Sequence, residues 1–188
     1  MSRIVDGPQL PASPPKPLLN LSLGDPTAYG NLRAPAPLTD AIVAAARDAS
    51  ANGYDHACGA PAARRAIALA SRPPVAPADV VIASGGSGAL ELAINVLVDA
   101  GDNVLAPRPG FPLYEVLTKS AGGEVRHYPL VAADDWEPDV AALEALVDGR
   151  TRAIVVCNPS NPCGSVHSRA ALAAIADVAY RHRVPLIA

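Results

Sequence analysis

A turn of small residues carries amides and hydroxyls that could do chemistry. Ser84-Gly85-Gly86-Ser87-Gly88 follows the β-branched run Val80-Val81-Ile82-Ala83 and precedes a stretch with helical spacing, Leu90 to Leu97. A strand, a glycine-rich turn and a helix N-terminus in series offer free amides and a favourable dipole to an anion. The turn predicts a phosphate site. It also imitates a nucleophile elbow built on Ser87, and it fits a plain turn without a ligand. The turn alone leaves these three interpretations open.

The overall composition is typical of a globular α/β protein. Of the 188 residues, 50% are hydrophobic, 18% are charged and only 4% are aromatic, which indicates one aliphatic core. The net charge of −3 gives no reason to expect nucleic acid or an anionic membrane as a partner. The apolar runs are too short to cross a bilayer, and the N-terminus lacks the apolar segment of a signal peptide. We expect a cytoplasmic protein, with a mitochondrial location left open.

The three cysteines Cys58, Cys157 and Cys163 have no metal-ligand spacing. An odd number of thiols suits a reducing compartment, and each is interpreted as a small buried hydrophobe. No metal site is expected.

Proline usage and periodicity divide the chain into three parts. Residues 1–20 predict an extended arm, because prolines at five positions between 8 and 17 exclude helix and central strand. Residues 21–78 predict turns and entry helices, the first helix running from Thr39 or Asp40 to about Ser50. Residues 79–188 alternate strand and helix, which predicts a three-layer α/β/α fold around a mostly parallel, mixed sheet.

Ligands of such sheets bind at the carboxyl ends of the strands. Three loops follow predicted strands: the Ser84–Gly88 turn, the loop exposing Phe111 and the loop containing Asn161. We therefore expect all three loops at one edge of the sheet. Besides the run at 80–83, the predicted elements are strands over 103–107, 125–130, 152–157 and from 184, and helices from 113, over 139–147 and from a cap at Ser168.

Five segments taken together resemble a known family. They are Leu23-Gly24-Asp25-Pro26-Thr27, Asn52-Gly53-Tyr54, the Ser84–Ser87 turn, Pro107-Arg108-Pro109-Gly110-Phe111-Pro112-Leu113-Tyr114, and Asn158-Pro159-Ser160-Asn161-Pro162-Cys163-Gly164-Ser165. In this order they are similar to fold-type I, pyridoxal-phosphate-dependent aminotransferases of class I/II. The last two segments resemble the tyrosine aminotransferase branch. The resemblance implies that residues 79–188 form the first part of the aminotransferase large domain.

The resemblance also implies roles for individual residues. Gly86, Ser87 and Gly88 would hold the phosphate of pyridoxal 5'-phosphate, and the Phe111 ring would stack on the pyridine. Asn161 would donate to the cofactor's phenolic oxygen and touch the substrate carboxylate. Tyr54 would reach the phosphate bound by a second copy in a homodimer, and Gly24 would lie near the substrate carboxylate. The expected substrates are an amino acid, aromatic and tyrosine-like, and a 2-oxo acid such as 2-oxoglutarate.

Transamination also needs a lysine that joins the cofactor and moves a proton. Neither Lys16, in the proline arm, nor Lys119, late in the helix after Phe111, fits that role. The resemblance places this lysine after Ala188, so no catalytic residue is assigned and the chain alone is expected to be inactive.

Two alternatives belong to other classes. One is a serine hydrolase using Ser87, with His167 or His182 as its base. The other is a non-catalytic fragment that binds pyridoxal phosphate or dimerises.

Overall fold

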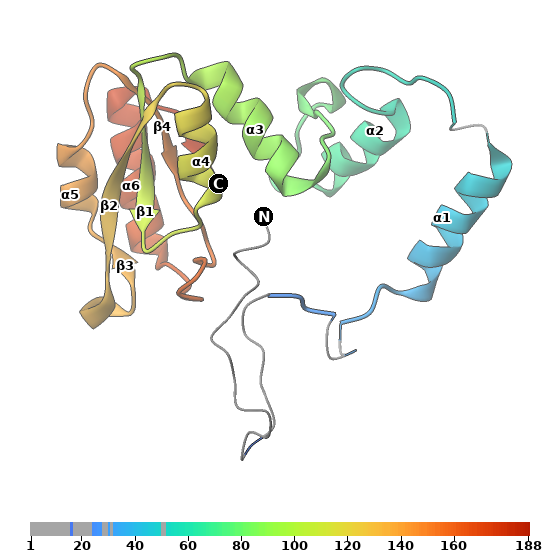
Figure 1. Ribbon diagram of the computed structural model, residues 1–188, viewed down its shortest axis with the longest axis horizontal. Helices are drawn as coiled ribbons and strands as arrows, with labels where there is room; N and C mark the ends of the chain where they lie inside the picture. Colours follow the sequence, from blue (N-terminus) through green and yellow to red (C-terminus); the bar gives the residue numbers. More distant parts are fainter. Residues whose placement is uncertain (1–15, 17–23, 28–29, 31, 50–51) are drawn as a thin grey trace. The chain divides into compact units, whose positions relative to one another are not determined.

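The computed structural model describes residues 16, 24–27, 30, 32–49 and 52–188 (Figure 1). Most of the predicted proline arm, residues 1–15 and 17–20, therefore lies outside the described residues. The chain divides into two units, Met1–Asp55 and His56–Ala188, and each is described by itself. Within the described residues no helix has the length and apolar character needed to cross a membrane.

The described part of the first unit contains one helix, α1 (Ala36–Asp48). It begins earlier than the predicted Thr39 or Asp40, because Pro37 occupies a position in the first turn, where a missing N–H costs nothing. The helix ends at Ala49, whose φ of 57° is left-handed.

The second unit contains a mixed sheet. Its strands are β1 (Asn103–Arg108), β2 (Glu124–Val131), β3 (Glu137–Pro138), β4 (Thr151–Val155) and β5 (Leu186–Ile187). The described strands follow the order β3-β2-β1-β4-β5. β1 pairs in parallel with β2 and β4, and β4 pairs in parallel with β5, whereas β3 is antiparallel to β2. The α-helices of this unit are α2 (Pro61–Ala70), α3 (Gly85–Leu97), α4 (Leu113–Ser120), α5 (Val140–Ala145) and α6 (Arg169–His182), and two short 3-10 turns cover Pro77–Asp79 and Ala132–Asp134.

Helices cover both faces of this sheet, which explains why its central strands are apolar without alternation. Val104 packs in the cluster beneath α3 and α4, and its neighbour Leu105 packs in the cluster beneath α5 and α6 (Figure 1). Ala153 and Ile154 of β4 divide between the two clusters in the same way. The predicted three-layer α/β/α fold with a mixed sheet is confirmed.

The predicted strand at Val80–Ala83 is wrong. This segment pairs with none of the described strands, and its N–H at Ile82 bonds instead to the carbonyl of Cys58, at 2.9 Å. Val81 is 57% exposed, although a buried strand would cover it. A β-branched run favours the extended conformation, but a strand also needs a neighbour with which to form a ladder.

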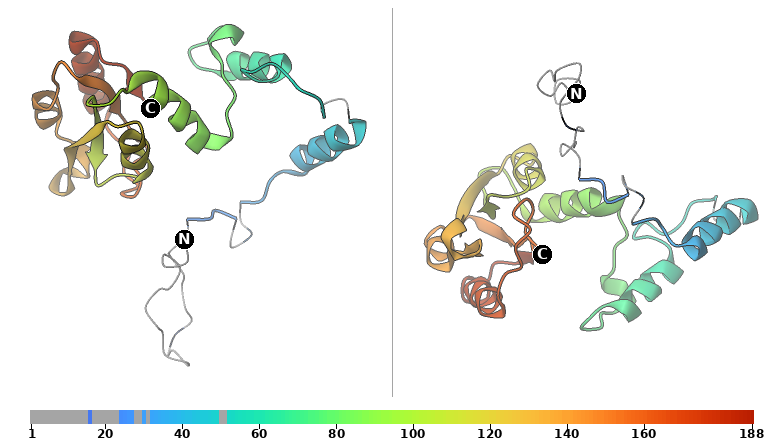
Figure 2. Two further views of the ribbon diagram at one scale, coloured as in Figure 1. Left: turned by 45° about the horizontal axis from the view of Figure 1, so that its top comes forward. Right: turned by 90° about the horizontal axis from the view of Figure 1, so that it is seen from below.

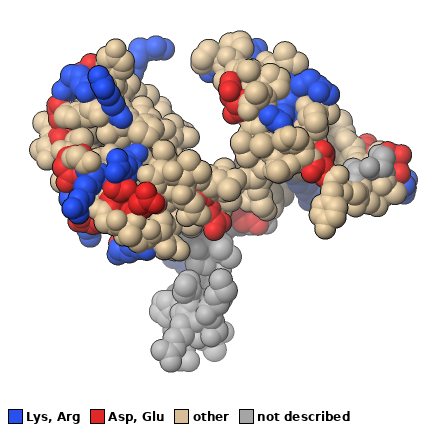
Figure 3. Space-filling view, turned by 90° about the horizontal axis from the view of Figure 1, so that it is seen from above, with Lys and Arg blue, Asp and Glu red and all other residues tan. Residues whose placement is uncertain are grey.

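α3 packs on the sheet through its C-terminal half. Ile94 is fully buried, and Val98, just after the helix, is nearly so, whereas Ser84 to Ser87 are exposed. Figures 1 and 2 show the same arrangement: the C-terminal end of α3 lies against the sheet and its N-terminal end points away from it. On the face drawn in Figure 3, acidic and basic side chains are interspersed over this unit.

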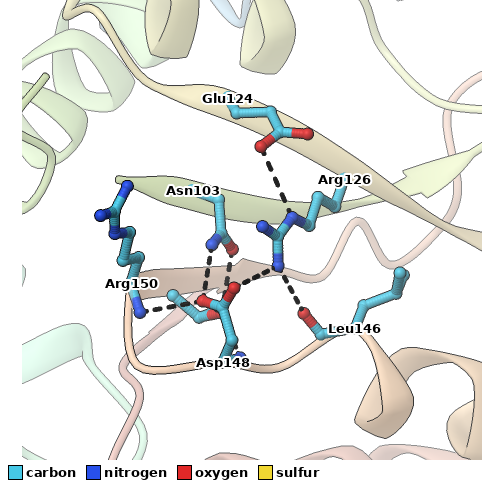
Figure 4. A network of polar contacts seen from close by, with 7 residues as sticks. Asn103, Glu124, Arg126, Leu146, Asp148 and Arg150 are labelled. Atoms are coloured by element: carbon cyan, nitrogen blue, oxygen red, sulfur yellow. Dashed lines mark hydrogen bonds and ion pairs between the residues drawn. The ribbon is translucent and has the colours of Figure 1, made fainter. Parts of the chain in front are cut away.

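A polar network joins the amino ends of three strands (Figure 4). Asp148, in the turn before β4, accepts from Asn103 Nδ2 at 2.9 Å, Arg126 Nη1 at 2.6 Å and the Arg150 backbone N–H at 2.8 Å. The Thr151 hydroxyl donates to Asn103 Oδ1 at 2.9 Å. These bonds fix the edge of the sheet that lies opposite the loops containing Phe111 and Asn161.

Candidate functional site

Two of the three predicted loops leave the sheet at the same edge. Because β1 and β4 are parallel neighbours, the loop with Phe111 after β1 and the loop with Asn161 after β4 both start at carboxyl ends. No strand places the Ser84–Gly88 turn at this edge, because the preceding Val80–Ala83 segment lies outside the sheet formed by the described strands. The expectation that all three loops follow strands is therefore wrong for the first.

The Phe111 ring is held on one side and open on another. It lies edge-to-face against Tyr114, with ring centroids 5.9 Å apart and planes at 87°. Tyr114 is buried, whereas Phe111 is 38% exposed. Burial raises the pKa of Tyr114 to about 12, and the nearby Cys157 thiol adds to the shift. The contact fixes the orientation of Phe111 while leaving part of the ring accessible to a flat ligand.

Phe111 also lines a cavity of about 320 Å³ between the loop, α4 and β2. His127 in its wall has a buried Nδ1 without a hydrogen-bond partner in the described structure. Its Nε2 lies 3.6 Å from Glu115, whose carboxylate pairs with Lys119. Lys119, with a smaller contribution from His127, lowers the pKa of Glu115. The wall consists of Ala106, Pro107, Arg108, Pro109, Gly110, Phe111, Pro112, Tyr114, Glu115 and His127. Among the described residues, neither Ser87 nor Asn161 contributes to it.

The loop after β4 is closed on itself and presents Asn161. The Ser160 N–H donates to the Ser165 carbonyl at 2.8 Å, and the Gly164 N–H donates back to the Ser160 carbonyl at 2.7 Å. Asn158 Oδ1 accepts from the His167 N–H at 2.9 Å, which ties the start of the loop to its end. Asn161 is exposed, and within the described residues its amide makes no hydrogen bond, so both its donor and its acceptor are available to a ligand.

Gly86, Ser87 and Gly88 form the first turn of α3. Amides in this position have no partner within the helix, and the Ser84 side chain does not cap them. No acidic residue lies in the turn, and a Cβ placed on Gly86 would meet no atom within 4 Å. The turn therefore has the free donors, the dipole and the open space that a phosphate group needs.

Gly24 and Tyr54 belong to the other unit. Both are exposed, and a Cβ on Gly24 would meet no atom within 4 Å. Their predicted roles toward the substrate carboxylate and toward a second copy stay predictions. In the described part of the chain, no group of three or more His, Cys, Asp or Glu side chains could hold a metal ion.

Sequence reasoning missed the contacts of Tyr114 and Cys157. Tyr114 follows Phe111 by three residues at a helix start, a spacing that brings side chains together and could have signalled the ring contact. Cys157 is half-buried and hydrogen-bonded to the Pro159 carbonyl, not only a small hydrophobe, and no local pattern reveals this.

The comparisons with known proteins agree on one family. Residues 16–188 match the family model described as aminotransferase class I and II. Tyrosine aminotransferase of Dictyostelium discoideum is 41% identical over 99% of this chain and 45% of its own length. The Mus musculus tyrosine aminotransferase is 43% identical over 98% of this chain and 41% of its own length. The crystal structure of tyrosine aminotransferase from Leishmania infantum superposes with a TM-score of 0.83 at 38% identity, covering 87% of this chain and 47% of that one.

The chain thus spans less than half the length of these relatives. The similarities give no support to a serine hydrolase. The geometry also disagrees with one, because among the described residues no strand leads into the turn of Ser87, as a nucleophile elbow requires. With nearly the whole sequence matched and the three-layer fold shared, this chain belongs to the class I and II aminotransferases.

Proposed function

We propose that this chain is the cofactor-binding portion of a pyridoxal-phosphate-dependent aminotransferase. The enzyme would move an amino group from an aromatic amino acid such as tyrosine to a 2-oxo acid such as 2-oxoglutarate. The observation that carries the proposal is the half-exposed Phe111 ring, fixed edge-on by Tyr114 at the carboxyl end of β1, while the neighbouring strand β4 leads into the loop of Asn161. The relatives named tyrosine aminotransferase support the substrate class.

The residues present fit the groups of pyridoxal phosphate one by one. The first-turn amides of α3 and the Ser87 hydroxyl would bind the phosphate, since they are exposed and uncapped. The Phe111 face would stack on the ring, and the Asn161 amide would donate to the phenolic oxygen. When bound, the cofactor supplies an electron sink for the carbanion that develops at the substrate's α-carbon. We extend the proposal to a homodimer in which Tyr54 reaches the phosphate held by the partner.

Binding of pyridoxal phosphate to the 188-residue chain tests the proposal, followed by the cofactor's absorbance and fluorescence. Replacing Phe111 with Leu should weaken binding by roughly two- to tenfold, the size of one aromatic stacking contact. Ser87→Ala should weaken it by about tenfold, as for one hydrogen bond to a charged group. Inorganic phosphate should compete with the cofactor.

Matched controls separate the site from general surface effects. Tyr180→Leu removes another exposed aromatic ring, on α6, and should leave the affinity unchanged. Ser71→Ala removes a serine at the C-terminal end of α2, where carbonyls and not amides are exposed. Absence of saturable binding, or equal losses in the control variants, would overturn the proposed function.

A further inference from the structure

Tyr114 contacts both sides of the candidate site. Its ring packs edge-to-face on Phe111 in the loop after β1. It also belongs to the buried cluster against which the side chain of Cys157, the residue that follows β4 by two positions, packs. The Tyr114 side chain is almost completely buried, with 8% exposed. Tyr114 therefore lies between the loop that follows β1 and the loop that follows β4, and these two strands end at the same edge of the sheet.

Cys157 extends this connection into the second loop. It packs against the cluster beneath α3 and α4 that contains Tyr114. Its Sγ donates to the carbonyl of Pro159 at 3.4 Å, and Pro159 lies two residues before Asn161. A continuous series of side-chain contacts thus runs from Phe111 through Tyr114 and Cys157 to the start of the Asn161 loop.

We propose that Tyr114 is a positioning residue that sets the Phe111 ring relative to the Asn161 loop through Cys157. This inference rests on the proposed function, in which Phe111 and Asn161 grip the same flat cofactor. A stacking face and a hydrogen-bond donor act on one ring only when their spacing is fixed, and buried contacts restrict that spacing more than exposed loop backbone does. Tyr114 touches neither substrate nor cofactor in this role.

The positioning of Phe111 by Tyr114 and Cys157 can be measured without the cofactor, because Phe111 is the only phenylalanine in the sequence. Incorporating 4-fluorophenylalanine gives one ¹⁹F resonance that reports the environment of this ring. Cys157→Ala should shift that resonance. Cys163→Ala is the matched control, since Cys163 belongs to the same loop but packs against the cluster beneath α5 and α6, and it should leave the resonance in place.

A second step tests whether Tyr114 carries the effect. In a Tyr114→Leu background, Cys157→Ala should cause no further shift of the ¹⁹F resonance. If Tyr114→Leu does not fold, as judged by circular dichroism, Tyr114→Phe removes only the hydroxyl and is compared by cofactor affinity. Tyr114→Phe and Cys157→Ala should each weaken pyridoxal phosphate binding by about two- to tenfold, the size of one polar side-chain contact. The double variant should lose no more than either single variant.

The outcomes distinguish the two proposals. If the unaltered chain binds no pyridoxal phosphate while Cys157→Ala still shifts the resonance, the proposed function fails, whereas the positioning role of Tyr114 is supported. If the chain binds the cofactor but Cys157→Ala changes neither the resonance nor the affinity, the positioning role of Tyr114 is overturned. Equal shifts from Cys157→Ala and Cys163→Ala would also overturn it, because the effect would then be general to the loop.

Discussion

Asn103 at the start of β1 donates its side-chain amide to Asp148, with 2.9 Å between Nδ2 and Oδ1. Asp148 also accepts from Arg126 of β2 and from the backbone of Arg150, so one carboxylate joins the amino ends of strands far apart in the sequence (Figure 4). These donors, with Arg126 foremost, hold the pKa of Asp148 well below its ordinary value.

The lowered pKa of Asp148 predicts acid sensitivity. A carboxyl whose folded-state pKa is depressed contributes stability above its unfolded-state pKa, about 3.9, and loses that contribution as the pH falls toward the folded value. The urea midpoint of the chain should therefore fall as the pH is lowered from 5 toward 3. Asp148→Asn should lower the midpoint at pH 7 and reduce its pH dependence below 5. Asp134→Asn replaces an exposed acid and is the control. If the urea midpoint of Asp148→Asn fell below pH 5 as steeply as that of the unaltered chain, the prediction would be contradicted.

The packing of α3 predicts a contrast between two neighbouring positions. Ile94 is fully buried against the sheet, whereas Val96 is 83% exposed on the same helix. Ile94→Ala should lower the free energy of unfolding by about 2–5 kcal/mol, through lost burial and the cavity left behind. Val96→Ala should change it by less than about 0.5 kcal/mol. Urea denaturation of both variants measures the difference, and similar losses would contradict the docking of α3 on the sheet through Ile94.

Local sequence rules predict most of the second unit because its central strands are covered on both faces. Apolar runs at β1 and β4 predict strands, and Ser168 predicts the start of α6, where its hydroxyl accepts from the Ala171 N–H at 3.1 Å. The segment Val80–Ala83 shows the limit of these rules: its composition favours extension, but pairing depends on a neighbour that no local pattern specifies.

The candidate site, too, could be predicted from the sequence only in part. The Phe111 and Asn161 loops could be predicted because each follows a strand, and parallel strands end at one edge. The contact of Tyr114 with Cys157 could not, since it joins residues 43 positions apart whose approach depends on the register between β1 and β4. Sequence patterns thus locate the loops, whereas the side chains that hold the loops together become visible only in three dimensions.

The close approach of Gly59 to Ile82 predicts a position that tolerates only glycine. Gly59 has a φ of +99°, and a Cβ built there would lie 2.6 Å from the Cβ of Ile82. Gly59→Ala should therefore destabilise the second unit by about 1–3 kcal/mol through backbone strain and this clash. Gly149→Ala is the control, because a Cβ there would meet no atom within 4 Å. Equal urea midpoints for the two variants would show that the Val80–Ala83 segment is not held against Gly59.

The placement of Lys119 predicts that the 188-residue chain by itself does not exchange amino groups. Transamination needs an amine that reaches the cofactor and the substrate's α-proton. The Lys119 Nζ lies 2.5 Å from Glu115, its i−4 neighbour on α4, and the side chain is 64% exposed. The other lysine, Lys16, belongs to the Met1–Asp55 unit. With tyrosine, 2-oxoglutarate and pyridoxal phosphate, the chain should form glutamate no faster than free cofactor does, and Lys119→Met should behave identically. Turnover that disappears in Lys119→Met would make Lys119 a catalytic residue and would contradict the prediction. Cofactor titration of the same samples separates a chain that binds without turning over from one that does not bind.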